Sequence, residues 1–357
     1  MKNAIKKTYI CRDVYHFDVA FNEQLLNKQP EVGDVALFEV VSIGKHSTIQ
    51  GDTKRNITIL PGDTIMAAFG TRYATEQFEG YVPVHCNRDL HILGAGGTVG
   101  VVETMHQKFK SVGPTVLKFA GYATDKVSGE VINTKKMYEQ QMVYFSGSHA
   151  AKTRIILSVG SSMDSGKTTS AAYLVRGLKK AGHSVAFIKL TGTVFTKDCD
   201  LNYDLGADMA VDFGSLGFPS TYMCSEDELL NLYESLVARV LTVQPEFVVM
   251  EIADGLYQRE TKMLLKSHKL MDTVYAVLFS AGDSLSAING INVLESWGIQ
   301  PMGISGLLTA SPLLIQEVKQ NTTVPVYTLS DLAGQAGKIV SENTVPAQEF
   351  VQLAKAS

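Results

Sequence analysis

The stretch TRIILSVGSSMDSGKTTS, residues 153–170, joins an apolar β-branched run, a loop of small residues and Gly-Lys-Thr-Thr without a gap. The apolar run predicts a buried strand, and the residues from Lys167 onward predict the start of a helix. Glycine and serine allow several backbone N–H groups to approach one anion, which is typical of a phosphate-binding loop. The stretch therefore predicts a strand, a phosphate loop and a helix in succession.

The whole loop is expected to bind a nucleotide together with Mg²⁺. Lys167 is expected to reach the β- and γ-phosphates as a point charge, and the Thr168 hydroxyl is expected to complete the shell of the metal ion. ATP is favoured over GTP because the chain has no Asn-Lys-x-Asp guanine signature. The predicted nucleotide-binding residues are Gly160, Ser161, Ser162, Met163, Asp164, Ser165, Gly166, Lys167, Thr168 and Thr169.

The spacing of this loop is unusual, because the gap between Gly160 and Gly166 is one residue longer than in the common P-loop pattern. The loop resembles that of dethiobiotin synthetase and its relatives, which carry the longer G-x5-G-K-T spacing. After the next predicted strand, the residues Lys189, Thr191, Gly192 and Gly206-Ala207 also match the outline of the dethiobiotin synthetase and molybdopterin-guanine-dinucleotide biosynthesis protein B families.

This resemblance implies roles for the residues between the two matches. Lys189 and Thr191 would lie near the phosphates or the acceptor substrate, and either Asp198 or Asp200 would lie near Mg²⁺. For the nearby Asp204 and Asp208, helix capping and solvation are the favoured interpretation.

A second acidic position follows the apolar run in FVVMEIADG, residues 247–255. A carboxylate at the end of a buried strand beside a phosphate loop typically orders the magnesium shell, so Glu251 is the first candidate and Asp254 the second. In the resembled enzymes a Glu-Gly-rich turn here faces the substrate, and this chain has Glu-Ile-Ala-Asp-Gly instead. Arg259, a little further on, is expected to clamp a phosphoryl group or a carboxylate, or else to form a surface ion pair near Glu260.

These observations give two sets of predicted functional residues. The predicted catalytic residues are Lys167, Lys189, Glu251 and Arg259. The predicted metal ligands are Thr168, Asp200 and Glu251.

The two parts of the chain differ in their patterns. Residues 1–147 have short alternating apolar runs broken by Gly, Pro and Asp, and they predict a β-barrel or sandwich with little helix. Two similar pieces, EVGDVALFEV at 31–40 and LPGDTIMAAF at 60–69, indicate an internal duplication. The glycine-rich LGAGGTVGVV at 93–102 predicts a hairpin rather than a dinucleotide site, because its glycine spacing is wrong and no helix pattern follows.

Residues 148–357 alternate strands with helices, which predicts an α/β domain: a mostly parallel P-loop sheet, Rossmann-like, with helices on both faces. Within it, SEDELLNLYESLVARVL at 225–241 predicts an amphipathic helix capped by Ser225 and Glu228. Short strands are expected at 273–280 and 324–329, and a last helix from about residue 345.

Composition restricts the function classes. A hydrophobic content of 45% with 19% charged residues is ordinary for a soluble globular protein, and a net charge of −4 gives no general attraction to nucleic acid or to an anionic membrane. The first residues contain no apolar run typical of a signal peptide, and the four cysteines form no C-x-x-C pair. We therefore expect a cytoplasmic protein without a disulfide framework or a structural zinc site.

The favoured function is a Mg-ATP-dependent P-loop enzyme of ligase type that activates a small carboxylate or carbamate. Its expected partners are the nucleotide and a small-molecule acceptor. The resemblance implies that the acceptor is enclosed by a homodimer, or else by the N-terminal barrel closing over that face. The added β-domain and the altered turn after Glu251 leave open a nucleotide-dependent switch or maturation factor that acts on a protein partner. The joining of a β-rich domain to a P-loop domain is also similar to a P-loop family related to D-glutamate N-acetyltransferase, which leaves an N-acyltransferase as a further alternative.

Overall fold

The structure is a computed structural model that describes residues 5–21, 25 and 28–342, and it divides into two compact units. The first unit joins the described residues up to Ser146 to the later segments Lys189–Cys199 and Val211–Arg239. The second unit contains Gly147–Ile188, Asp200–Ala210 and the described residues from Val240 onward. Two segments of the range 148–357 therefore belong with the N-terminal β-domain.

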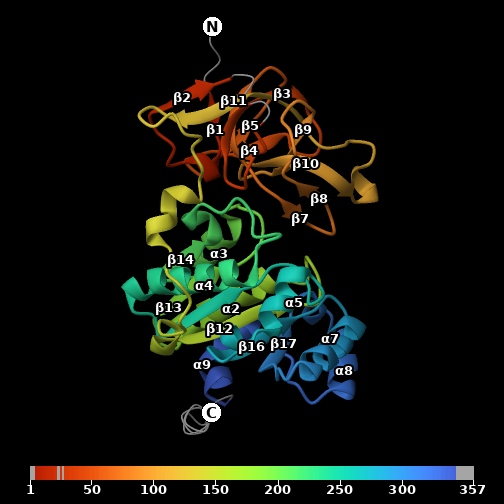
Figure 1. Cartoon of the computed structure of the whole chain (residues 1–357). Helices are drawn as coiled ribbons and strands as arrows, with labels where there is room; N and C mark the ends of the chain where they lie inside the picture. The colour runs from red at the N-terminus through yellow and green to blue at the C-terminus, as the bar shows by residue number, and fades with distance from the viewer. Residues whose placement is uncertain (1–4, 22–24, 26–27, 343–357) are drawn as a thin grey trace. The chain divides into compact units, whose positions relative to one another are not determined.

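Five strands of the first unit pair in a closed ring and form a barrel. They are β3 (Val35–Ser42), β6 (Thr64–Phe69), β9 (Leu90–Gly94), β10 (Thr98–Met105) and β11 (Val116–Asp125). Figure 1 labels β3, β9, β10 and β11 among them. Around the ring β6 pairs with β3, β3 with β11, β11 with β9 and β9 with β10, all antiparallel, and a parallel pairing of β10 with β6 closes it. The expected β-barrel-like domain is confirmed.

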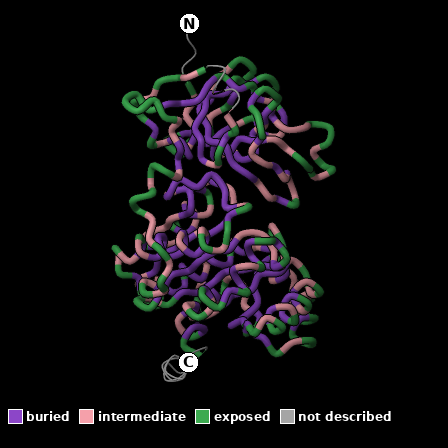
Figure 2. Tube along the Cα trace, in the orientation of Figure 1, coloured by how far each residue is buried: buried purple, intermediate pink, exposed green. Residues whose placement is uncertain are grey.

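Shorter strands extend this barrel. They are β1 (Lys6–Lys7), β2 (Phe17–Ala20), β7 (Arg72–Tyr73) and β8 (Phe78–Tyr81), with a separate hairpin of β4 (Thr48–Gln50) and β5 (Asn56–Thr58). Aromatic rings fill the interior. The ring centres of Phe38 and Phe69 are 5.3 Å apart and those of Phe119 and Tyr122 are 4.9 Å apart, and both pairs are edge to face. Each such pair adds about 0.5–1.5 kcal/mol beyond the burial of its area. Figure 2 shows the barrel strands largely buried.

The two Gly-Asp turns are alike in structure as well as in sequence. Gly33 and Gly62 both have positive φ, +96° and +86°. Gly33 N–H donates to Phe69 O, and Gly62 N–H donates to Val40 O, each at 2.8 Å. Each turn also has an aspartate paired with a lysine at 2.5 Å, Lys28–Asp34 in the first and Lys6–Asp63 in the second. The adjacent strands β3 and β6 thus repeat one turn at opposite ends, as the duplication predicts.

The glycine-rich stretch at 93–102 forms a hairpin, as predicted. β9 pairs antiparallel with β10, and Gly97 in the turn has φ +109°. A β-strand follows the turn where a dinucleotide site would need a helix.

Buried polar contacts explain why two later segments belong to the first unit. The Gln50 side chain donates to Thr196 Oγ1 at 2.8 Å and accepts from Thr196 N at 3.1 Å. Thr98 Oγ1 donates to Pro219 O at 2.9 Å. Since unpaired buried polar groups are costly, these contacts tie the segments to the barrel strands.

Helix α4 (Glu226–Val240) makes up the later part of the second of these segments and has the predicted cap. The Ser225 backbone N–H donates to Glu228 Oε2 at 3.0 Å, and the Glu228 N–H donates to Ser225 Oγ at 3.2 Å. The predicted stripe is buried and consists of Leu229, Leu232, Leu236 and Val240.

The second unit is built on a six-stranded sheet with the order β14-β13-β15-β12-β16-β17. The strands are β12 (Arg154–Gly160), β13 (Val185–Lys189), β14 (Met209–Asp212), β15 (Phe247–Glu251), β16 (Val274–Ser280) and β17 (Gly303–Ser305). β12 pairs in parallel with β15 and β16, and β16 pairs in parallel with β17. Helices flank this sheet (Figure 1), so the α/β fold class is confirmed.

The helices of this sheet include α2 (Lys167–Lys180) and α9 (Leu329–Glu342), which pack against each other. Gly177 permits this approach, because an added Cβ there would collide with Leu332 O. The others are α3 (Lys197–Asp204), α5 (Arg259–Lys266), α6 (His268–Met271), α7 (Ser284–Ser296) and α8 (Pro312–Asn321).

Two expectations near the C-terminus have different outcomes. The strand expected at 324–329 is reduced to a single bridge between Val326 and Ile304. The helix expected from residue 345 lies outside the described residues. Within residues 5–21, 25 and 28–342, none of the helices combines the length and apolar character needed to cross a bilayer.

Candidate functional site

The predicted phosphate loop lies between the end of β12 and the start of α2. Its two glycines are needed for close packing. A Cβ on Gly160 would collide with Ser165 Oγ and lie 2.7 Å from Lys167 Cγ. Gly166 has φ +95°, and a Cβ there would lie 2.9 Å from Gly306 Cα. The loop thus requires glycine at both ends.

Lys167 begins α2 and is 6% exposed. Its ammonium group donates to Ser162 O at 2.7 Å and lies 3.5 Å from Ser165 Oγ. The side chain therefore folds back over the loop, where its ammonium group could pair with a phosphate bound there.

Thr168 and Glu251 meet beside the loop, although 83 residues separate them in sequence. Thr168 Oγ1 donates to Glu251 Oε1 at 3.1 Å, and Glu251, the last residue of β15, is 2% exposed. Glu251 reaches this place because it pairs in register with Ser158 of β12. A hydroxyl and a carboxylate at this distance offer oxygen ligands of the kind that Mg²⁺ takes.

The turn after β15 presses against the phosphate loop. Asp254 has φ +64°, and a Cβ on Gly255 would collide with Ser161 O and lie 2.8 Å from Ser162 Cα. Thr261 Oγ1 donates to Ala253 O at 2.8 Å and braces the turn. Gly255, the last residue of Glu-Ile-Ala-Asp-Gly, is therefore required because any side chain there would collide with the phosphate loop.

Arg259 and its neighbours form a local network. Arg259, the first residue of α5, pairs with Glu260, and its side chain is 45% exposed. Glu260 is 1% exposed and also accepts from Gln258, while Gln258 Oε1 accepts from Thr261 N at 2.9 Å and caps α5. Arg259 is therefore part of an ion pair with Glu260 itself, and its role toward a substrate stays a prediction.

Lys189 and Asp198 belong to the first unit, where they form an ion pair. Burial raises the pKa of Asp212 in the same unit, opposed by the positive charges of Arg12 and Lys189. Asp200 lies on α3 at the start of a segment of the second unit. The roles of Lys189, Asp198 and Asp200 toward phosphate or metal stay predictions.

Asp208, by contrast, has a structural role, although it is not the helix capping or solvation that was expected. Its carboxylate accepts from Lys179 Nζ at 2.7 Å and from Val185 N at 2.8 Å.

A pocket of about 290 Å³ opens beside the start of α2. Gly166, Thr169 and Ser170 form one wall. The remaining lining residues come from the loop after β17 and the start of α9, and they are Gly306, Leu307, Thr309, Ala310, Thr328, Leu329 and Ser330. No motif in the sequence marked Thr328–Ser330 as part of this pocket.

Two buried hydroxyl groups near the loop lack a hydrogen-bond partner among the described residues. They belong to Ser161, the first loop residue after Gly160, and to Ser280, the last residue of β16. The backbone N–H of Ser161 donates to Ser280 O at 2.9 Å. Buried polar atoms are usually paired, so these groups fit a site that receives a polar ligand or water.

No cluster of three or more His, Cys, Asp or Glu residues suited to a metal occurs within the described part of the chain. At the loop, Thr168 and Glu251 are a pair of oxygen-bearing side chains that meet.

Comparisons with known proteins give distant similarities only. No family model matches the chain, and neither does any curated protein. A DUF1611 family protein from Anabaena variabilis matches with a TM-score of 0.39 and 15% sequence identity. The match covers 56% of this chain and 61% of that protein's chain. The signal recognition particle receptor FtsY from Elizabethkingia anophelis has a TM-score of 0.36 and 16% identity over 60% of this chain and 75% of its own. Its complex with GDP has a TM-score of 0.36 and 14% identity, with coverages of 54% and 64%.

Proposed function

We propose that this chain is a P-loop NTPase that binds Mg-ATP at residues 160–169. The observation that carries the proposal is the hydrogen bond between Thr168 and Glu251, because it joins the helix start after the loop to the acidic end of the neighbouring strand. In P-loop NTPases a hydroxyl and a carboxylate at these two places hold the metal. The pocket beside Gly166 and Thr169 is the proposed place of the base.

The proposed reaction is activation of a small carboxylate or carbamate by transfer of the γ-phosphoryl group. Mg²⁺ would supply neutralising charge on the phosphates, with Thr168 and Glu251 as its protein ligands. Lys167 would exchange its bond to Ser162 O for phosphate oxygens and stabilise the charge that develops there. Arg259 would hold the acceptor, for which it must give up part of its pairing with Glu260.

Calorimetry with Mg-ATP and Mg-GTP tests the binding step. The Lys167→Ala variant is expected to lose tenfold or more in affinity, since a hydrogen bond to a charged group is worth about 1.5–3 kcal/mol. Lys180→Ala is the matched control, because Lys180 is an exposed lysine at the other end of the same helix. Equal affinities in the wild-type protein and both variants would contradict the proposal.

The reaction class needs its own assay. Small carboxylic acids and amines with bicarbonate are added to the purified protein and ADP release is measured. A rise above the basal rate with one of them is expected, and it should disappear in Lys167→Ala. If only a protein partner raises the rate, the ligase-type reaction is wrong.

One observation favours the switch as a second candidate. The strands β13 and β14 both end at residues that belong to the first unit, Lys189 and Asp212. The chain therefore leads directly from the sheet that carries the phosphate loop into the β-domain. Pull-down experiments with the protein loaded with ATP or ADP would support this function if a partner is retained in only one state.

A further inference from the structure

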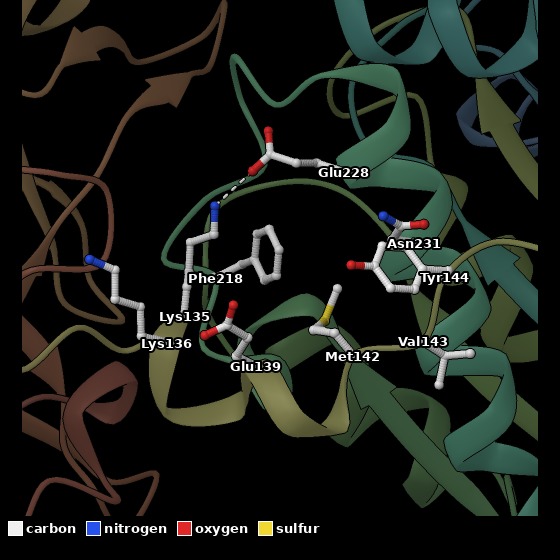
Figure 3. Close-up of a pocket in the computed structure, with 9 residues that line it drawn as sticks. All are labelled: Lys135, Lys136, Glu139, Met142, Val143, Tyr144, Phe218, Glu228 and Asn231. Carbon is white, nitrogen blue, oxygen red and sulfur yellow. Dashed lines mark hydrogen bonds and ion pairs between the residues drawn. The ribbon is translucent and has the colours of Figure 1, made fainter.

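The first unit contains a pocket of about 330 Å³ that plays no part in the proposed nucleotide site. Residues between Lys135 and Tyr144 form one wall, and Phe218 with Glu228 and Asn231 of α4 forms the other (Figure 3). This volume is at the lower end of the range for small-molecule sites.

The walls of the pocket are held together by hydrogen bonds to α4. Val143 N–H donates to Ser235 Oγ at 2.8 Å, and Phe145 N–H donates to Asn231 Oδ1 at 2.8 Å. These bonds fix the backbone on both sides of Tyr144. A wall fixed in this way is preorganised, which reduces the entropy lost on binding.

The pocket has an apolar and aromatic side. Met142, Val143 and Phe218 line it, and Tyr144 stands at its rim with 87% of its surface exposed. Figure 3 shows the Tyr144 hydroxyl directed toward Phe218, across the pocket. Such surfaces bind flat apolar groups and also attract cations through the ring faces.

The two lysines and two glutamates of the lining differ in their pairing. The Lys135 ammonium pairs with Glu228 at 2.8 Å and lies 4.5 Å from the centre of the Phe218 ring. The charges of Lys135 and Glu228 therefore neutralise each other. Lys136 pairs with Glu31 at 3.0 Å, outside the pocket. Among the described residues Glu139 makes no ion pair, and Figure 3 shows its carboxylate directed into the pocket. Within the described part of the chain, Glu139 is therefore the charged lining residue without an ion-pair partner.

We propose that this pocket binds a small organic cation, a primary amine carried on a compact apolar body. Its ammonium group pairs with the Glu139 carboxylate, and its body lies against Met142, Phe218 and Tyr144.

Three probes of the same shape test the charge requirement: 2-phenylethylamine, 2-phenylethanol and phenylacetate. Binding to the full chain is measured by calorimetry, and the ¹³C-methyl NMR signal of Met142 reports its location. The amine is expected to bind about tenfold more tightly than the alcohol, as for a charge-assisted hydrogen bond. Phenylacetate is expected to bind more weakly than either, and the Met142 signal should shift with the amine.

Three variants locate the interaction. Glu139→Gln is expected to bind amine and alcohol equally, whereas Tyr144→Ala is expected to weaken both. Glu130→Gln removes an exposed carboxylate that does not line the pocket, so it is the matched control and should keep the preference for the amine. All three residues are surface positions, and circular dichroism checks that each variant folds. The proposal is overturned by absence of amine binding, by a preference for the alcohol or the acid, by retained preference in Glu139→Gln, or by an unchanged Met142 signal.

Discussion

Thr168 Oγ1 lies 3.1 Å from Glu251 Oε1, and this hydrogen bond joins the second residue of α2 to the last residue of β15. Each residue comes from a different pattern in the sequence, the first from Gly-Lys-Thr and the second from the end of an apolar run. The parallel pairing of β12 and β15 brings the two together. The carboxyl ends of adjacent parallel strands are where ligands of open α/β sheets bind.

The first prediction concerns this pair. Glu251→Gln is expected to keep most of the nucleotide affinity measured without metal and to lose the part that depends on Mg²⁺, because a carboxylate charge is removed from the proposed ion site. Calorimetry with ATP, with and without Mg²⁺, measures the difference. Glu317→Gln, at an exposed position of α8, is the control and should behave like the wild-type protein. Unchanged Mg²⁺ dependence in Glu251→Gln would exclude this metal ligand.

The second prediction concerns the contact of Gly255 with the phosphate loop. Gly255→Ala is expected to destabilise the fold by about 1–3 kcal/mol, as overpacking usually does, and to weaken nucleotide binding by displacing Ser161 and Ser162. Chemical denaturation and calorimetry measure the two effects. Gly282→Ala provides the comparison, since a Cβ on Gly282 meets nothing within 4 Å. Equal free energies of unfolding for the two variants would contradict this prediction, because they would show that the loop accommodates the added methyl group without destabilisation.

The third prediction concerns the cap of α4. Ser225→Ala is expected to lower the free energy of unfolding by about 1 kcal/mol, because the Glu228 N–H loses its acceptor. Urea denaturation measures the loss. Ser225→Thr keeps the hydroxyl group and should restore most of the stability. A loss of the same size in both variants would assign the effect to something other than the cap.

The fourth prediction concerns Lys45 in the barrel unit. Burial, followed by the charges of Arg72 and Lys108, lowers the pKa of Lys45 to about 8 from 10.5. Because the pKa is lower in the folded state, unfolding takes up a proton between these two values, and this lysine makes stability rise with pH in that window. NMR of ¹³C-dimethylated lysines is expected to show a midpoint near 8 at Lys45. Lys118, an exposed lysine, is the internal reference, and a Lys45 midpoint equal to it would contradict the expectation.

Local patterns predicted the parts of the fold that depend on neighbouring residues. The loop glycines, the cap of α4 and the turns at Gly33 and Gly62 each follow from a few adjacent residues and from the backbone angles that those residues permit. The order of strands around the barrel was not predictable in this way. It depends on pairings such as that of β10 with β6, which no short motif encodes.

The candidate site was predicted to a similar extent. Lys167, Thr168 and Glu251 lie in patterns whose chemistry is local, and the sheet brings them together. Thr328–Ser330 line the pocket beside the loop only because α9 packs against α2, which depends on the fold. Lys189 and Asp198 were assigned together from a resemblance, and the buried Gln50–Thr196 contact that ties their segment to the barrel unit was not visible in the sequence.

The interleaving of the two units has a consequence for how the protein is made. The first unit begins with the earliest described residues, yet it includes Val211–Arg239, which the ribosome adds much later. Residues up to Ser146 can form barrel strands while synthesis continues, but Thr98 has no carbonyl of Pro219 to bind until that part has emerged. By then β12, α2 and β13 have already been synthesised. The first unit can therefore be completed only after synthesis of the second has begun, so we expect the barrel to reach its final packing late, after residue 239 has been made.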